Sequence, residues 1–367
     1  MTENKILKNE EKAVLALRSL YRHHGYLPFK MSKFEEYDFY AENKDFLVSD
    51  SVITFNDTDG RLLALKPDVT LSIIKNTVYQ EGCKHRVYYD ENVYRVSGST
   101  HRFKEIMQAG LECIGDIDIY DIYEAIYLAA KSLSLVCADF VLDVSHMGVF
   151  SAVLDSFGES ESFKKKAASL IAEKNKHETV ALCREYDISK ENTDKLLTLI
   201  SLYGGVGEVL SELDGICTTE RERAMYNELS KLCELISKCE FKDNIRLDFS
   251  VVNNMSYYNG VVFKGFLKGI CEGVLSGGEY QTLMSRMGRR GSGVGFALYL
   301  DLLDELDYER EEYDVDVLLI YNEGVDTDRI LSVKSELVNL GKRVSVQRSI
   351  PEKLRYKEII NLCEGEK

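Results

Sequence analysis

The sequence predicts an α+β fold, with an antiparallel sheet flanked by helices, a helical insertion and a short C-terminal α/β tail. Alternating or β-branched runs bounded by turn signals predict strands over residues 51–56, 61–67, 85–97, 106–115 and within 245–276. Residues 159–240 contain no proline and repeat apolar residues at helical spacing, which predicts an all-helical insertion. Residues 313–348 read as strand, helix and strand. Strands segregated from helices are typical of the α+β class.

Helices and turns complete this division of the chain. Helices are predicted over residues 3–24, 69–78, 121–136, 293–306 and 353–365. The Asp59-Gly60 pair is a hairpin signal between the first two strands. The expected domains are a core of residues 1–158 and 241–312, the insertion at 159–240, and the tail at 313–367.

Composition and charge limit the class of protein. The chain has 367 residues, 45% hydrophobic and 29% charged, which suits two or three packed cores rather than a disordered chain. Its formal net charge of −15 disfavours binding to the phosphate backbone of a nucleic acid, so we expect no nucleic acid as a partner. No segment resembles a signal peptide or a membrane span, so we expect a cytoplasmic protein without a membrane partner.

The nine cysteines and six histidines follow no metal-binding pattern. No C-x-x-C or H-E-x-x-H spacing occurs, and no cluster of the two residue types stands out. We therefore expect reduced thiols, no metal site and no cofactor.

A hairpin of two strands carries the first candidate pocket residues. Gln108 and Glu112 are four apart on one strand, so they share a face with Gly110, and Arg95 lies across the hairpin. An amide, a carboxylate and a guanidinium together suit a small zwitterion, and Gly110 leaves room for a ligand against the backbone. The alternative is the exposed polar face of a half-buried sheet.

Two other segments carry further candidate residues. Residues 63–72, LALKPDVTLS, open a helix at Asp68 and Thr70, which is also the pattern of a simple N-cap. Residues 250–263, SVVNNMSYYNGVVF, read as a strand, a tight turn and a second strand, on which Tyr257 and Tyr258 alternate faces. The alternative is that one tyrosine packs in the core and the other lies on the surface, without a binding role.

Taken in order, these segments resemble the catalytic core of class II aminoacyl-tRNA synthetases, and specifically histidyl-tRNA synthetase. LALKPDVT is similar to that family's L-R-P-E-G-T segment, and residues 87–112 resemble its motif 2 with a Q-x-G-x-E strand. VVNNMSYYNGVVF resembles its histidine-recognition strand, R-G-L-D-Y-Y-x-x-T-V-F, and residues 277–300 resemble motif 3. The resemblance covers roughly residues 5–305 and implies a class II synthetase-like antiparallel sheet.

Three positions depart from the synthetase pattern. The arginine of the recognition strand falls on Asn253, the arginine of G-L-E-R in motif 3 is assigned to Asp301, and the glutamate of F-R-x-E in motif 2 falls on Ser97. Because nucleotidyl transfer depends on cations that clamp the phosphates, these losses argue against adenylation. The tail also resembles a truncated anticodon-binding domain.

Such a core without ATP chemistry resembles the regulatory subunits of ATP phosphoribosyltransferase, at the first step of histidine biosynthesis. The resemblance implies a non-catalytic chain that a short-form catalytic subunit requires for activity and for histidine feedback. It also implies a hetero-octamer and a self-dimer through the synthetase-like core. Two alternatives are a divergent histidyl-tRNA synthetase and a histidine-binding sensor that acts on another partner.

The resemblance further implies a histidine-type pocket. In it, the amino group would meet Asp68 and Thr70, Gln108 would bridge, the imidazole would meet Glu112 and Tyr258 beside Tyr257, and the carboxylate would meet Arg95. Whether effector histidine binds here or at the interface with the catalytic subunit is left open by the sequence.

Overall fold

The computed structural model describes residues 7–47, 52–96, 102–251, 258–306 and 312–363. The chain divides into two compact units, Met1–Leu306 and Asp307–Lys367, which are described separately below. This division falls close to the predicted start of the tail. The further separation of the first unit into a core and an insertion stays a prediction.

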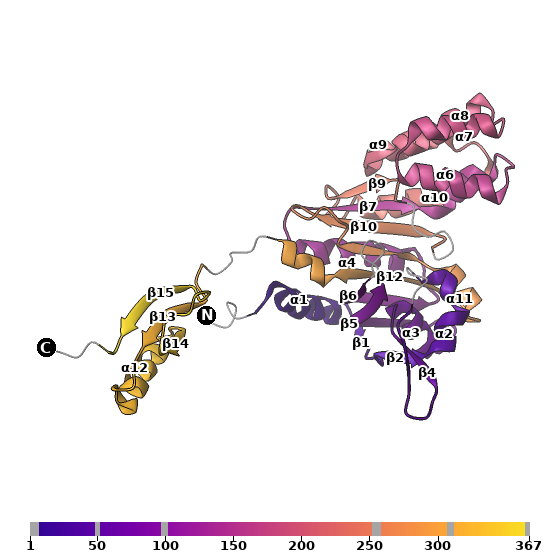
Figure 1. Cartoon of the computed structure of the whole chain (residues 1–367). Coiled ribbons are helices and arrows are strands. Elements are labelled where there is room, and N and C mark those ends of the chain that lie inside the picture. The colour runs from indigo at the N-terminus through magenta and orange to yellow at the C-terminus, as the bar shows by residue number, and fades with distance from the viewer. Residues whose placement is uncertain (1–6, 48–51, 97–101, 252–257, 307–311, 364–367) are drawn as a thin grey trace. The chain divides into compact units, whose positions relative to one another are not determined.

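The first unit is built on a nine-stranded sheet, which confirms the α+β class (Figure 1). The spatial order of the strands is β1-β5-β6-β12-β11-β10-β7-β9-β8. Neighbours are antiparallel except for β1 with β5 and β7 with β9. The strands are β1 (Leu27–Pro28), β5 (Lys84–Val96), β6 (Phe103–Gly115), β7 (Phe140–His146), β8 (Tyr203–Gly205), β9 (Ile245–Asp248), β10 (Val261–Leu267), β11 (Leu275–Glu279) and β12 (Ser292–Tyr299).

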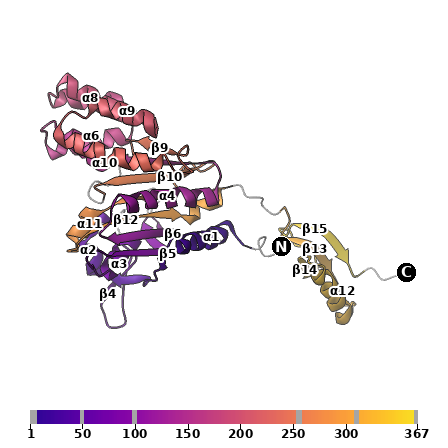
Figure 2. The same ribbon diagram turned by 180° about the vertical axis from the view of Figure 1, so that it is seen from behind.

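One face of this sheet is covered by helices. They are α1 (Asn9–His23), α4 (Ile119–Val136) and α5 (Met147–Asp155), and Figure 2 shows α4 lying along the strands. Tyr21 of α1 is fully buried, and its hydroxyl lies 3.0 Å from that of Ser132 on α4. Burying large side chains such as Tyr21 and Phe296 from both layers supplies the main stabilising term of the core.

The opposite face carries smaller elements that frame the site. A three-stranded sheet of order β2-β4-β3 lies there with three short α-helices and one 3₁₀ helix. These elements are β2 (Phe34–Glu36), α2 (Tyr37–Glu42), the 3₁₀ helix η2 (Lys44–Phe46), β3 (Thr54–Asn56), β4 (Leu62–Leu65), α3 (Val69–Asn76) and α11 (Gln281–Arg286). The predicted hairpin is confirmed: β3 and β4 pair antiparallel, and Gly60 takes the positive φ of +86° that its turn requires.

Residues 159–240 are mostly helical, as predicted. The helices are α6 (Glu161–Ala172), α7 (Lys176–Glu185), α8 (Lys190–Ser201), α9 (Val206–Ile216) and α10 (Glu220–Ile236). Ser160, Asn175, Ser189 and Thr219 each accept a backbone N–H at a helix start. The insertion is not wholly helical, because β8 pairs antiparallel with β9 at the edge of the large sheet.

Two predicted helices were wrong. Residues 293–306 form strand β12 and the 3₁₀ helix η3 (Leu300–Glu305), because β12 lies between β6 and β11, where both of its faces are covered. A strand buried on both faces is apolar throughout, so its pattern cannot be told from that of a buried helix. Within 353–365, residues Tyr356–Asn361 form strand β15, whose partner β13 (Val315–Ile320) supplies the long-range hydrogen bonds that local periodicity does not reveal.

The second unit is a small α/β layer. The parallel strands β13 (Val315–Ile320), β14 (Val344–Gln347) and β15 have the order β14-β13-β15, and α12 (Thr327–Asn339) connects β13 to β14. The predicted strand, helix and strand are therefore confirmed. Val317, Leu318 and Leu319 of the central strand are fully buried.

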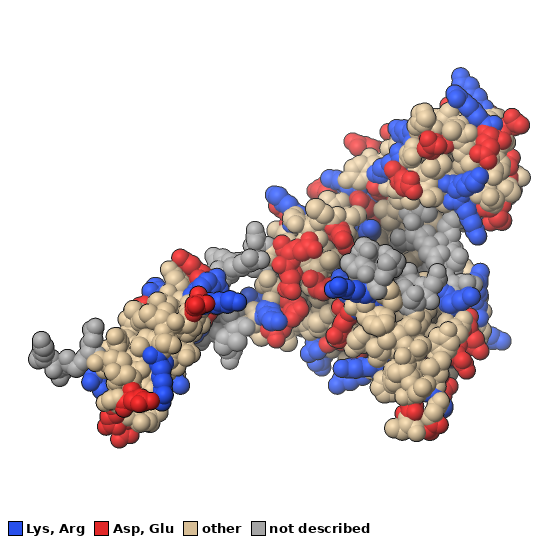
Figure 3. Space-filling view, viewed as in Figure 1, with Lys and Arg blue, Asp and Glu red and all other residues tan. Residues whose placement is uncertain are grey.

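The described residues contain no helix long and apolar enough to cross a membrane. Within the same residues, no group of three or more histidine, cysteine or acidic side chains has a metal-binding arrangement. Figure 3 shows lysine and arginine side chains interspersed with acidic ones over the visible face.

Candidate functional site

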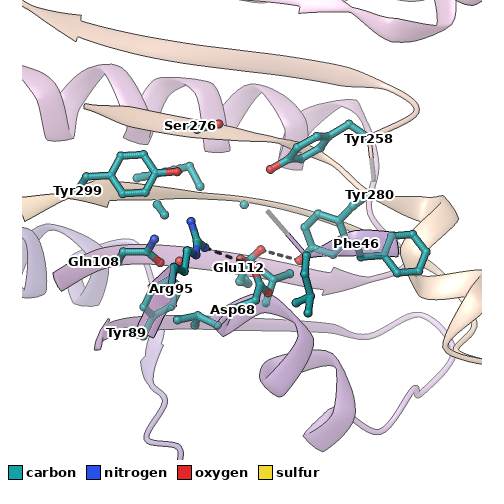
Figure 4. A pocket seen from close by; sticks show the side chains of 16 residues that line it. Phe46, Asp68, Tyr89, Arg95, Gln108, Glu112, Tyr258, Ser276, Tyr280 and Tyr299 are labelled. Carbon is teal, nitrogen blue, oxygen red and sulfur yellow. Dashed lines mark hydrogen bonds and ion pairs between the residues drawn. The ribbon is translucent and has the colours of Figure 1, made fainter. Parts of the chain in front are cut away.

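A cavity of ≈ 390 Å³ lies on the sheet face opposite α4, between α3, β6, β11 and β12. Six of the seven predicted pocket residues line it: Asp68, Thr70, Arg95, Gln108, Glu112 and Tyr258. The seventh, Tyr257, lies outside the described residues. Figure 4 shows Tyr258 and Tyr299 across the cavity from Gln108 and Glu112.

Glu112 is the buried acid at the floor of this cavity and is 2% exposed. The Thr70 hydroxyl donates to one of its carboxylate oxygens at 2.7 Å, and the Tyr280 hydroxyl donates to the other at 2.5 Å. Burial raises the pKa of Glu112 to about 8, against these two hydrogen bonds, which lower it. A ligand group that donates a hydrogen bond to this carboxyl would therefore favour its charged form.

Asp68 and Arg95 form the charged side of the cavity. The Asp68 carboxylate accepts the backbone N–H of Leu71 at 2.9 Å, so its predicted role as a helix N-cap is confirmed. Arg95 donates from Nε to the carbonyl oxygen of Pro67 at 2.8 Å and places Nη2 3.9 Å from the other Asp68 oxygen. Burial raises the pKa of Asp68, while Arg95 lowers it. A carboxylate and a guanidinium side by side match the two charges of a zwitterion.

Gln108 provides an unused hydrogen-bond donor. Its side chain is 2% exposed, and its amide nitrogen has no hydrogen-bond partner among the described residues. The register places Gln108 between Glu91 of β5 and Tyr299 of β12, with its side chain facing the cavity. Because leaving a buried donor unpaired costs about 1–3 kcal/mol, this amide points to a ligand acceptor.

Aromatic residues that the sequence patterns did not single out complete the lining. They are Phe46, Tyr89, Tyr280, Phe296 and Tyr299. Tyr89 also corrects the expectation for Gly110: a Cβ at that position would meet the Tyr89 hydroxyl at 2.6 Å, so Tyr89 fills the space expected for a ligand. No local signal marks Tyr89 or Phe46, whereas Tyr280 directly follows the Gly277-Gly278 strand that resembled motif 3.

The histidyl-tRNA synthetase family model matches residues 4–303. The chain belongs to the histidyl-tRNA synthetase family. It is 27% identical over 330 residues to a protein of Oceanobacillus iheyensis named ATP phosphoribosyltransferase regulatory subunit, covering 88% of this chain and 81% of that one. A protein of the same name from Clostridium acetobutylicum is 27% identical over 360 residues, covering 93% and 86%. The predicted resemblance to such regulatory subunits is thus confirmed.

Solved structures confirm the class II synthetase-like fold of this family member. An ATP phosphoribosyltransferase regulatory subunit/histidyl-tRNA synthetase from Bacillus halodurans C superimposes with a TM-score of 0.73 at 24% identity, over 98% of this chain and 95% of that one. A chain of an ATP phosphoribosyl transferase complex from Thermotoga maritima gives a TM-score of 0.63 at 19% identity, over 79% and 97%.

One synthetase position needs a corrected assignment in this family member. Aligned letter by letter, G-L-E-R falls on Tyr299-Leu300-Asp301-Leu302, so the arginine corresponds to Leu302 and the glutamate to Asp301. Tyr299 then stands where the motif has a glycine, and its ring lines the cavity. Asp301 lies on η3 and pairs with Lys104 Nζ at 2.9 Å. Ser97 and Asn253 lie outside the described residues.

The raised pKa of Glu112 predicts a pH-dependent stability. Its pKa is about 8 in the folded chain and near 4.5 when unfolded, so between these values the folded state holds the extra proton. Stability is therefore expected to fall as pH rises through this window and to level off above about 8. Glu112→Gln removes the titrating group and keeps its shape, so urea unfolding of this variant should show a weaker pH dependence. An unchanged dependence would contradict the prediction.

Proposed function

We propose that this chain is a non-catalytic regulatory subunit of ATP phosphoribosyltransferase that binds histidine in the cavity. The names and extensive coverage of its relatives support this function. The proposal that histidine binds here rests mainly on Gln108, whose amide nitrogen has no hydrogen-bond partner among the described residues. The same cavity also holds a buried carboxyl and a guanidinium. These groups are arranged for recognition of a small zwitterion.

The ligand's three polar groups each have a matching partner. Its ammonium group is placed beside Asp68, and its carboxylate beside Arg95. Its imidazole is placed against Glu112 and Tyr258, where a ring N–H can donate to the carboxylate. Gln108 then gains an acceptor for its amide nitrogen, which has no hydrogen-bond partner among the described residues.

The same cavity is poorly equipped for adenylation. Arg95 is the one lysine or arginine among its described lining residues, and it already contacts Asp68 and the Pro67 carbonyl. Phosphoryl and nucleotidyl transfer need several cations or metal ions around the phosphates. The replacement of the motif 3 arginine by Leu302, with Tyr299 in place of the glycine, supports binding without catalysis.

The proposed assembly follows the family resemblance. A short-form catalytic subunit is the partner, in a hetero-octamer within the cytoplasm, and the synthetase-like core forms the self-dimer. Histidine is the effector, and no cofactor is part of the proposal. Feedback requires histidine to favour one state of the assembly over another, typically by about 1–3 kcal/mol.

Reconstitution tests this proposal. A short-form catalytic subunit from the same cell is assayed for phosphoribosyl transfer alone, with this chain, and with this chain plus histidine. We expect activity only with the chain present, and inhibition by histidine. If the two proteins neither co-purify nor alter each other's activity, the regulatory function fails and a sensor for another partner becomes the better interpretation.

A further inference from the structure

A second cavity of ≈ 190 Å³ lies on the other face of the large sheet. It sits where the sheet, the start of α4 and α10 of the insertion meet. Figures 1 and 2 both show α10 beside the strands at this end of the sheet. Its lining residues are Ile117, Asp118, Ile119, Ile122, His146, Glu228, Leu232, Val261 and Glu279. None of them lines the first cavity.

The strand register builds the floor of this second cavity. His146, the last residue of β7, pairs with Val261 of β10. Val262 pairs with Gly278, so the continuing register sets Val261 beside Glu279. These three side chains therefore lie in a row on one face. The alternation of β11 turns Ser276 toward the first cavity and Glu279 toward the second.

His146 presents a donor without a hydrogen-bond partner to this space. The side chain is 1% exposed, and its Nδ1 accepts the backbone N–H of Val149 at 3.2 Å, as the N-cap of α5. The hydrogen of the neutral ring is therefore on Nε2. Nε2 has no hydrogen-bond partner in the described part of the chain. It forms an ion pair with Glu228, whose carboxylate oxygen is 3.7 Å away.

Packing holds the imidazole in this orientation. A Cβ at Gly148 would meet Met225 Sδ at 2.7 Å and the His146 Cε1 atom at 2.8 Å. The absence of a side chain at Gly148 thus lets Met225 of α10 pack close to the ring. The ring is held by this packing and by the bond to Nδ1, while Nε2 lies near Glu228 without a hydrogen bond, so an acceptor on a ligand could take its hydrogen.

The walls combine negative charge with apolar surface. Glu228 is exposed at the rim, and Glu279 is half-buried, with its carboxylate accepting from the Ser292 hydroxyl at 3.3 Å. Burial raises the pKa of Glu279, and Glu228 raises it further. The ion pairs of the described residues include no lysine or arginine bound to either glutamate, whereas Asp118 pairs with Lys84 at 3.1 Å.

We propose that this second cavity is a ligand site for a small primary amine that also carries a hydroxyl or ring-nitrogen acceptor. The ammonium group binds between Glu228 and Glu279, and the acceptor takes the His146 Nε2–H. The isoleucines contact the carbon skeleton. The cavity is larger than one bridging water needs. A carboxylate would face two glutamates, so amino acids are disfavoured.

Histamine is a suitable probe, because it combines an ammonium group with a ring nitrogen and has no carboxylate. Calorimetric titration of the full chain should show saturable binding. Glu228→Gln and Glu279→Gln should each weaken it about tenfold, since each removes a charge-assisted hydrogen bond. Glu234→Gln, at an exposed position on the same helix, should leave it unchanged. Because histamine shares the ammonium and imidazole groups of histidine, the titration is also run with saturating histidine, which blocks the first cavity.

Nitrogen-15 NMR of the histidine side chains gives a second readout that needs no variant. Histamine should shift the His146 Nε2 resonance and leave exposed His177 unaffected. Absence of saturable binding would overturn the proposal. It would also be overturned by equal binding to wild type and both glutamate variants, or by an unmoved His146 signal at saturation.

Discussion

Gln108→Leu is expected to lower histidine affinity by about 10- to 100-fold while leaving the fold intact. The amide nitrogen has no hydrogen-bond partner among the described residues, so its removal costs no hydrogen bond within them. Replacing an unsatisfied buried polar group by an apolar one of similar size is neutral or stabilising. In the complex, however, the lost bond to a charged ligand accounts for the drop in affinity. This prediction rests on the proposed histidine site.

Calorimetric titration with histidine measures the affinity of the variant, and urea unfolding measures its stability. Gln80→Leu, at an exposed glutamine outside the cavity, is the matched control and should bind like wild type. Undiminished histidine binding by Gln108→Leu would place the effector site elsewhere, for example at the interface with the catalytic subunit. A large loss of stability would contradict the assignment of Gln108 as a group that serves the ligand.

Gly295→Ala is expected to destabilise the chain by about 1–3 kcal/mol and to disturb the site. A Cβ on Gly295 would fall on the Glu112 carboxylate and on the carbonyl oxygen of Leu111. The backbone oxygen cannot move aside without straining the pairing of β12 with β6, in which Gly295 lies opposite Glu112. The hydrogen bonds from Thr70 and Tyr280 to Glu112 should weaken together.

Gly207→Ala is the control for the Gly295→Ala substitution. Gly207 lies within α9, and a Cβ there would meet nothing within 4 Å. Removing a helical glycine should raise stability by roughly 0.5–1 kcal/mol. Opposite signs for the two variants in urea unfolding would support the close approach of β12 to Glu112. Equal, small effects would show that Gly295 is not confined as the structure describes.

The order of strands and helices was largely readable from sequence because local patterns encode them. Alternation marked β5 and β6, and Asp59-Gly60 marked the hairpin. The failures have a common cause. β12 is buried on both faces and β15 is defined by pairing with β13, so neither carries a periodicity that identifies a strand. Non-local pairing is absent from any short window of sequence.

The polar residues of the site and Tyr258 were predictable from the sequence, and the other aromatic residues were not. Gln108 and Glu112 share a face by simple alternation, and their neighbours came from motif resemblance. Tyr89 and Tyr299 are brought in by strand pairing. The hydrogen bond from Tyr280 to Glu112 joins residues far apart in sequence.

Histidine-dependent exchange of pyrophosphate into ATP tests the central claim most directly. The purified chain is assayed with histidine, ATP and Mg²⁺, beside a histidyl-tRNA synthetase as the positive control. Binding without adenylation predicts no exchange above background, even at histidine concentrations that saturate the cavity. Robust exchange that depends on histidine would contradict the account and identify the chain as a divergent synthetase.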